Sequence, residues 1–319
     1  MKRTLSILLV FSMLLALCAC GVNPEVSADS TSSAEPVSVS EPPAPESVVE
    51  TPAPTPAPVV SVQEDEDSAL EAMEQDVVLV DDENCTMKLV SISPDNDWGY
   101  TWNVFMENKT DKNLMFSVDN VSVNGVMCDP FWASIVSAGK KSNEEISWMT
   151  EDFEQLGITD VTVVEFELSI YDDDDWSAPD LVNDTFTVYP LGKDAVDLME
   201  YTPSPDDRVL FDNDECTMIV TGFDPNGVWG YTMNAYLVNK TDRTLLFSAD
   251  NVSINDTMCD PFWSSTVAPG KASYQSISWS PDDFNANSIS TVEQIQMDIS
   301  ACDDNSMDEV FRDTFTIEP

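Results

Sequence analysis

The chain has 319 residues, which is room for about two domains of ordinary size. Its 59 acidic residues outnumber 13 Lys and Arg, for a formal charge of −46. A field of that sign repels nucleic acid and anionic lipid, so we expect neither as a partner, and it favours basic partners or divalent cations. There is no histidine, which excludes Ser-His-Asp and Cys-His catalysis and His-ligated zinc.

The first residues have the pattern of an export signal. Lys2 and Arg3 precede an apolar run, residues 5–17, that is too short to span a membrane comfortably. Leu-Cys-Ala-Cys-Gly follows at residues 17–21 and resembles the lipobox of bacterial lipoproteins, in which an invariant cysteine follows a small or apolar triplet. Cys20 fits that cysteine best, with Ala19 directly before it.

The lipobox resemblance implies that residues 1–19 are a lipoprotein signal peptide and that a diacylglyceryl group is attached to the thiol of Cys20. Two acyl chains hold a protein stably at a membrane, whereas one does so only weakly. Cys18, at the second position before Cys20, departs from the usual pattern, and an ordinary cleaved signal is the alternative. We expect a lipid-anchored protein on the outer face of the bacterial cell membrane.

Residues 20–76 are rich in Pro, Ala, Ser, Thr, Val and Glu and, beyond Cys20, contain no Lys or Arg. Such a segment buries too little apolar surface to offset its ordering entropy, and its prolines favour extended geometry. We predict a disordered, acidic, Pro-rich stalk.

The remainder of the chain is a tandem repeat. Cys85-Thr-Met, Trp98-Gly-Tyr-Thr, Asn108-Lys-Thr-Asp and Met127-Cys-Asp-Pro-Phe-Trp all recur at an offset of 131 residues, which slips to 129 near the end. One gap over more than a hundred residues predicts the same fold twice. The boundaries are 77–189 for the first repeat, 190–207 for a linker and 208–319 for the second repeat.

Within each repeat the apolar residues alternate with polar ones, as in Val164, Phe166, Leu168 and Ile170. That period is typical of half-buried antiparallel strands. Asn108-Lys-Thr-Asp and Val123-Asn-Gly are turn signals. Helix-start patterns at residues 150 and 280 predict one short helix per repeat. We predict an all-β protein with two tandem immunoglobulin-like β-sandwiches, each of about seven or eight strands.

Two cysteine pairs have the same spacing in the two repeats: Cys85 with Cys128, and Cys216 with Cys259. An exported protein meets oxidising conditions, so the simplest interpretation is one disulfide inside each repeat. Buried free thiols are the alternative. Cys302 is left over, stands where the first repeat has a tyrosine, and is expected to be a free thiol.

The recurring Asp-Pro-Phe-Trp segments supply the candidate ligand surface, formed by Phe131, Trp132, Phe262 and Trp263. A loop that follows a strand can present such aromatics to a glycan or a protein. Core packing explains shared aromatics at least as well, particularly for Trp98, Trp148 and their equivalents.

Acid clusters such as residues 172–175 raise the alternative of calcium binding, but adjacent aspartates cannot all converge on one ion. There is no Gly-rich phosphate loop and no Gly-x-Ser-x-Gly elbow. We therefore predict no catalytic residues, no metal site, no cofactor and no enzymatic activity.

At the Asn-Lys-Thr-Asp, Asp-Asn-Val-Ser-Val-Asn-Gly (Asp-Asn-Val-Ser-Ile-Asn-Asp in the second repeat) and Asp-Pro-Phe-Trp segments, each repeat resembles immunoglobulin-like domains of unknown function that follow lipoprotein signals in Gram-positive bacteria. The resemblance implies β-sandwiches and no catalytic residue. Our hypothesis is a membrane-anchored extracellular lipoprotein that displays two modules for binding a protein or glycan at the cell envelope. The alternatives are a structural spacer without a specific ligand and a calcium-dependent binding module.

Overall fold

The computed structural model describes residues 59–61 and 77–319, which all belong to the compact unit Pro54–Pro319. The predicted signal peptide, Cys20 and most of the predicted stalk lie outside the described residues. Within the stalk range, Val59–Ser61 form strand β1, which pairs in parallel with Thr187–Tyr189. The pairing is one that a β-branched segment favours at the open edge of a sheet, and the disordered stalk stays a prediction for the rest of the range.

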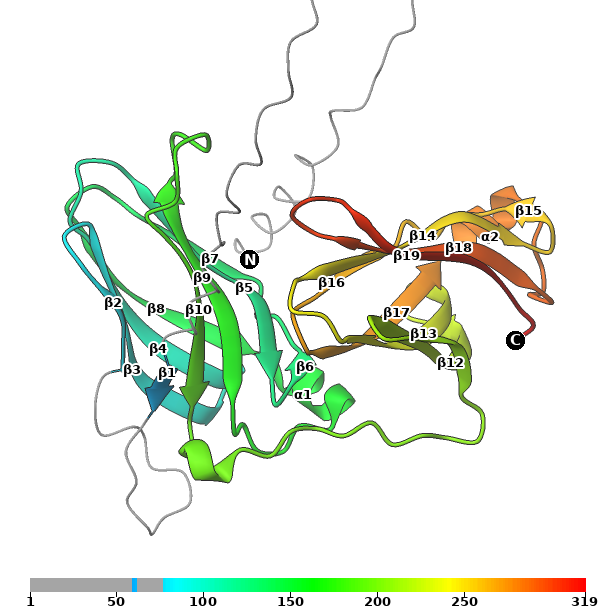
Figure 1. Cartoon of the computed structure of the whole chain (residues 1–319), viewed down its shortest axis with the longest axis horizontal. Helices are drawn as coiled ribbons and strands as arrows, with labels where there is room; N and C mark the ends of the chain where they lie inside the picture. The colour runs from blue at the N-terminus through cyan, green and yellow to red at the C-terminus, as the bar shows by residue number, and fades with distance from the viewer. Residues whose placement is uncertain (1–58, 62–76) are drawn as a thin grey trace, which may run out of the picture. The chain divides into compact units, whose positions relative to one another are not determined.

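The first repeat is a sandwich of two antiparallel sheets, which Figure 1 shows lying face to face. One sheet has the order β2-β3-β4-β8, and the other has β10-β9-β5 with β6 and β7 both on the far side of β5. The strands are β2 Val77–Asp81, β3 Cys85–Asn96, β4 Gly99–Asn108, β5 Leu114–Val123, β6 Val126–Met127, β7 Trp132–Val136, β8 Lys141–Trp148, β9 Val164–Asp172 and β10 Val182–Tyr189.

The second repeat has the same arrangement, with sheets β11-β12-β13-β17 and β19-β18-β14, the latter flanked by β15 and β16. Its strands are β11 Arg208–Asp212, β12 Cys216–Gly227, β13 Gly230–Asn239, β14 Leu245–Ile254, β15 Thr257–Met258, β16 Ser264–Val267, β17 Ala272–Trp279, β18 Ile295–Asp303 and β19 Glu309–Ile317. The predicted all-β class and sandwich architecture are confirmed. Each repeat has nine strands in the described residues, rather than seven or eight, because two-residue strands such as β6 and β15 count separately.

Alternation along the strands places the core between the sheets. On β9 every second residue from Val164 to Asp172 is buried, and the residues between are half-buried on the outer face. Trp102 packs edge-to-face on Trp148 with ring centroids 5.2 Å apart, and Phe166 lies 5.6 Å from Trp102. Aromatic pairs in this geometry stabilise a core by about 0.5–1.5 kcal/mol beyond their area burial.

Each repeat has the predicted short helix, α1 Thr150–Leu156 and α2 Pro281–Ala286, and the linker adds a 3₁₀ turn, η1 Lys193–Ala195. In α2 the hydroxyl of Ser280 accepts the backbone N–H of Asp283 at 3.1 Å, with Pro281 at the first helical position. This is the N-cap arrangement that the sequence predicts. In α1 the N-cap is Met149, which supplies no side-chain acceptor.

The Asn-Lys-Thr-Asp motif forms a turn in both repeats, at the end of β4 in the first and at the end of β13 in the second. The buried amide of Asn108 donates to the carbonyl oxygens of Lys112 and Val136 at 2.7 Å each, and its oxygen accepts from the backbone N–H and hydroxyl of Thr110. Asn239 makes the equivalent contacts in the second repeat. A side-chain amide has two N–H donors and an oxygen that accepts two hydrogen bonds, so these four bonds use all of its positions. The motif is therefore explained by its role in holding the turn.

Val123-Asn-Gly is the predicted turn between β5 and β6, and both turn residues have positive φ, 50° for Asn124 and 84° for Gly125. Positive φ at both central residues is typical of a type I′ hairpin turn. The Asn124 side chain also accepts the backbone N–H groups of Thr162 and Val163 at 2.9 and 3.2 Å, which attaches the turn to the segment before β9.

Candidate functional site

Among the five cysteines of the described residues there is no disulfide, so the prediction of the Cys85–Cys128 and Cys216–Cys259 pairs is corrected here. All four are buried free thiols. Cys85 is opposite Asn108 at one end of β4, whereas Cys128 accepts the indole N–H of Trp148, which is opposite Tyr100 at the other end. Eight positions of extended strand are roughly 26 Å long, and a disulfide needs Cα atoms within about 7 Å.

The backbone carbonyl of the second cysteine in each repeat has a structural role. The carbonyl of Cys128 accepts from Trp148 Nε1 at 2.8 Å, and that of Cys259 accepts from Trp279 Nε1 at 2.9 Å. These bonds fix the start of each Asp-Pro-Phe-Trp loop to the core. Cys302 is a free, partly exposed thiol on the outer face of β18, as predicted.

Each Asp-Pro-Phe-Trp loop projects a phenylalanine into solvent. Phe131 is 94% exposed and Phe262 is 92% exposed, with φ of 50° and 49°. The carboxylate of Asp129 accepts the backbone N–H of Phe131 at 2.7 Å, and Asp260 does the same for Phe262 at 2.8 Å. Positive φ is uncommon for a bulky residue, so the loop holds each ring outward in a strained conformation.

The tryptophans of the same loops behave differently. Trp132 and Trp263 are half-buried and pack against the cores of their repeats. Trp263 Nε1 also lies 3.3 Å from the side-chain oxygen of Gln275. Of the four predicted ligand residues, the structure therefore presents the two phenylalanines to solvent, while the two tryptophans support the loop.

A second pair of exposed aromatics was predicted to be core and is not. Trp98 is 70% exposed and Trp229 is 77% exposed, each at the tip of a hairpin. The following Gly99 and Gly230 have positive φ, and a Cβ on either would lie 2.2 Å from a tryptophan carbonyl oxygen. Only glycine fits at these positions, so the Trp-Gly pair turns the hairpin tightly and leaves the indole outside.

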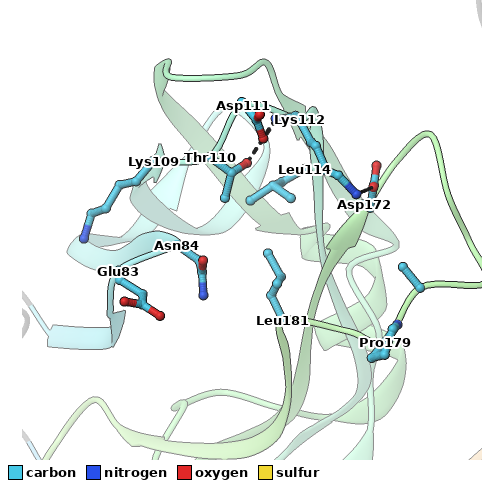
Figure 2. A pocket seen from close by; sticks show the side chains of 11 residues that line it. Glu83, Asn84, Lys109, Thr110, Asp111, Lys112, Leu114, Asp172, Pro179 and Leu181 are labelled. Carbon is cyan, nitrogen blue, oxygen red and sulfur yellow. Dashed lines mark hydrogen bonds and ion pairs between the residues drawn. The ribbon is translucent and has the colours of Figure 1, made fainter.

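A cavity of about 400 Å³ lies beside the Asn-Lys-Thr-Asp turn of the first repeat (Figure 2). In that view the side chains of Lys112 and Asp172 point toward each other, and they form an ion pair. Lys109 pairs with Asp81 at 2.8 Å and donates to the carbonyl of Asp82 at 2.6 Å. Because both lysines already have acidic partners, the cavity offers no uncompensated positive charge to an anion.

The acidic loop after β9 uses its first carboxylate internally. The Lys112 ammonium lowers the pKa of Asp172, and the backbone N–H groups of Asp174 and Asp175 add to that effect. Among the described residues, no group of three or more His, Cys, Asp and Glu side chains is placed to hold a metal ion. In that part of the chain there is also no helix with the length and apolar character to cross a membrane.

Comparison with known proteins gives only weak structural matches, all at low TM-scores. No family model matches the chain, and no curated protein matches it. Among solved structures, the YadV chaperone is similar at 11% identity with a TM-score of 0.20, covering 69% of this chain and 92% of that one. The Salmonella enterica SafA pilin–SafB chaperone complex matches at 10% identity and 0.19, covering 68% and 89%. A protein of unknown function from Porphyromonas gingivalis W83 matches at 12% and 0.18, covering 69% and 91%.

Proposed function

We propose that this chain is a lipid-anchored extracellular protein whose two β-sandwiches bind a ligand of the cell envelope through their exposed loop phenylalanines. The observation that carries the proposal is the repetition of Phe131 as Phe262 with the same exposure, the same positive φ and the same aspartate contact. A residue that needed only to complete the loop would not have to be aromatic.

The physical cost of the arrangement supports a binding role. A positive φ in a residue other than glycine costs about 1 kcal/mol or more, and an exposed phenyl ring gains little from folding. On a ligand the same ring would bury its apolar area without further loss of backbone entropy, because the loop already holds it in place. Two such rings in one chain also raise avidity if both repeats reach the same target.

Anchoring is the second part of the proposal and rests on the lipobox-like residues 17–21. Expression of the full chain in a bacterium, followed by mass spectrometry of the mature N-terminus, should find a diacylglyceryl-modified Cys20. Cys20→Ser should release the protein into the medium. An unmodified N-terminus on a protein that stays with the membrane would contradict lipid anchoring.

The binding test uses the full lipidated chain in neutral lipid vesicles, with purified Gram-positive cell-wall sacculi as the probe. Sedimentation of the vesicles with the sacculi should fall for Phe131→Ser and for Phe262→Ser, and further for the double variant. Val209→Ser is the matched control, because Val209 is an exposed apolar residue outside the loops. Equal sedimentation of all variants, or none by the unchanged chain, would overturn the proposal and leave the spacer role.

A further inference from the structure

The outer face of the first sandwich carries an apolar row with aromatic residues at one end, and the equivalent row of the second sandwich has no aromatic residue. Met115 on β5 is directly opposite Ile135 on β7 and Tyr171 on β9. Directly opposed residues have Cβ atoms about 5 Å apart, so the three side chains form one continuous row. The indole of Trp176 extends it, with its ring centroid 5.9 Å from that of Tyr171. We refer to Ile135, Met115, Tyr171 and Trp176 as the outer strip.

The outer strip is accessible and held in place. Ile135 is 51% exposed and Trp176 is 76% exposed, while the other two side chains are half-buried against the sheet. Trp176 Nε1 donates to the carbonyl of Asp173 at 2.9 Å, which fixes the indole beside the tyrosine. An exposed aromatic pair in a fixed position is a preformed contact surface.

Carboxylates surround the aromatic end of the strip. Burial raises the pKa of Tyr171, and the charges of Asp119, Asp173 and Asp180 raise it further, so these acids lie near its hydroxyl. In the described part of the chain none of these three aspartates forms an ion pair. The nearby Lys112 is paired with Asp172. The strip therefore combines aromatic faces with uncompensated negative charge.

The second repeat shows that the fold does not require the strip. Its equivalent row is Thr266, Leu246 and Cys302, which pair in the same register. It has no aromatic at either of the positions of Ile135 and Tyr171, and the loop after β18 contains no tryptophan. The aromatic character is thus a property of the first repeat alone.

We propose that the outer strip binds a cationic segment of a partner polypeptide, with Lys or Arg side chains stacked on Trp176 and Tyr171. A cation over an aromatic face gains cation–π energy, and the surrounding carboxylates complement its charge. The apolar end at Met115 and Ile135 accommodates the methylene stems of those side chains. The chain's net charge of −46 speeds the encounter with such a partner.

The test measures binding of fluorescent deca-arginine and deca-lysine peptides to the full chain in neutral vesicles at physiological salt. Non-specific attraction to the acidic surface is separated by variants that leave the charge unchanged. Trp176→Ala should weaken peptide binding several-fold, and Trp176→Ala combined with Tyr171→Ala by about tenfold, as expected for exposed cation–π contacts. Near-ultraviolet circular dichroism checks that the fold is kept.

Trp229→Ala is the matched control, because this tryptophan is equally exposed but lies in the second repeat, away from the strip. It should leave peptide binding unchanged, as should Phe131→Ser, so a failure here is distinct from a failure of the loop proposal. Equal losses for Trp229→Ala and Trp176→Ala would overturn the inference. Trp176-dependent binding of a neutral oligosaccharide, with no such dependence for the peptides, would also overturn it.

Discussion

The two repeats share a polar framework and differ in what they pack inside and present outside. Asn108 and Asn239 donate to equivalent backbone carbonyls, and so do Trp148 and Trp279. The core, in contrast, has Trp102 in the first repeat where Met233 is buried in the second. Hydrogen-bond geometry tolerates little change, whereas apolar volume can be filled in several ways.

The surfaces of the two repeats also have some features in common and others that differ. The loop phenylalanines are alike in both repeats, but the outer strip exists only in the first. Features repeated with their hydrogen bonds belong to the fold or to a shared function, and features found once are candidates for a role specific to one repeat. The three predictions below test how far the two repeats are equivalent.

The largest expected effect is on thiol reactivity. Burial raises the pKa of Cys85 and Cys128 to about 12, that of Cys216 to about 11, and that of Cys259 in the same direction. The thiolate is the reactive form, so the raised pKa values, together with burial, should make these four thiols react much more slowly than an exposed thiol. Iodoacetamide labelling of the native chain, read by peptide mass spectrometry, should modify Cys302 first.

The control for thiol labelling is the same reaction in denaturant, where all four buried cysteines should become as reactive as Cys302. Fast native labelling of either buried pair would show that one repeat is open, and would break the equivalence of the two frameworks. Full resistance of the buried thiols in denaturant without reductant would show disulfides and contradict the structure.

The next effect concerns the turn amides. Asn108→Ala leaves buried donors and acceptors unpaired, which should lower the free energy of unfolding of the first repeat by about 3 kcal/mol. Asn239→Ala should lower that of the second repeat by a similar amount, because its contacts are the same. Urea titration with thiol labelling of Cys85 or Cys216 reports each repeat separately.

Asn183→Ala provides the control, because Asn183 bonds Asp180 from an exposed position and should change stability little. A loss of stability confined to one repeat would mean that the shared motif contributes differently to the stability of the two sandwiches. A negligible loss in both would refute the architectural account of Asn-Lys-Thr-Asp.

Local patterns allowed much of this fold to be predicted from the sequence. The strict alternation on β9 identifies its buried face, and Ser280-Pro281 identifies the start of α2, because both signals depend on neighbouring residues. The pairing of Cys85 with Cys128 failed because equal spacing says nothing about which end of a strand a residue occupies. That information comes from register, which depends on contacts distant in sequence.

The candidate site was also only partly predictable from the sequence. Phe131 was identified because its motif is repeated, but the motif could not show that Trp132 turns inward. From the sequence, core packing explains Trp98 at least as well as exposure does; the signal that points outward is the glycine after it. The outer strip was missed because Ile135, Met115 and Tyr171 meet only through the strand register.

The smallest predicted effect is a difference in pH dependence between two equivalent ion pairs. A hydrogen bond from Lys112 is the main cause that lowers the pKa of Asp172. For Asp303 the main cause is the backbone N–H of Ser306, and Arg243 contributes less, from 3.4 Å. Removing the cation should therefore lower the stability of the first repeat more than that of the second. Lys112→Gln and Arg243→Gln change the net charge equally, so each is the control for the other.

A carboxyl whose pKa is lower in the folded than in the unfolded state stabilises the fold above its unfolded pKa of about 3.9. That stabilisation is lost as the pH falls through the lower, folded value. The melting temperature of Lys112→Gln should consequently lie below that of the unchanged chain at neutral pH, and the gap should close below about pH 4. Arg243→Gln should show a smaller gap over the same range, because the backbone donors keep Asp303 ionised. Equal gaps for the two variants would mean that the two acidic loops stabilise their repeats in the same way despite their different lengths.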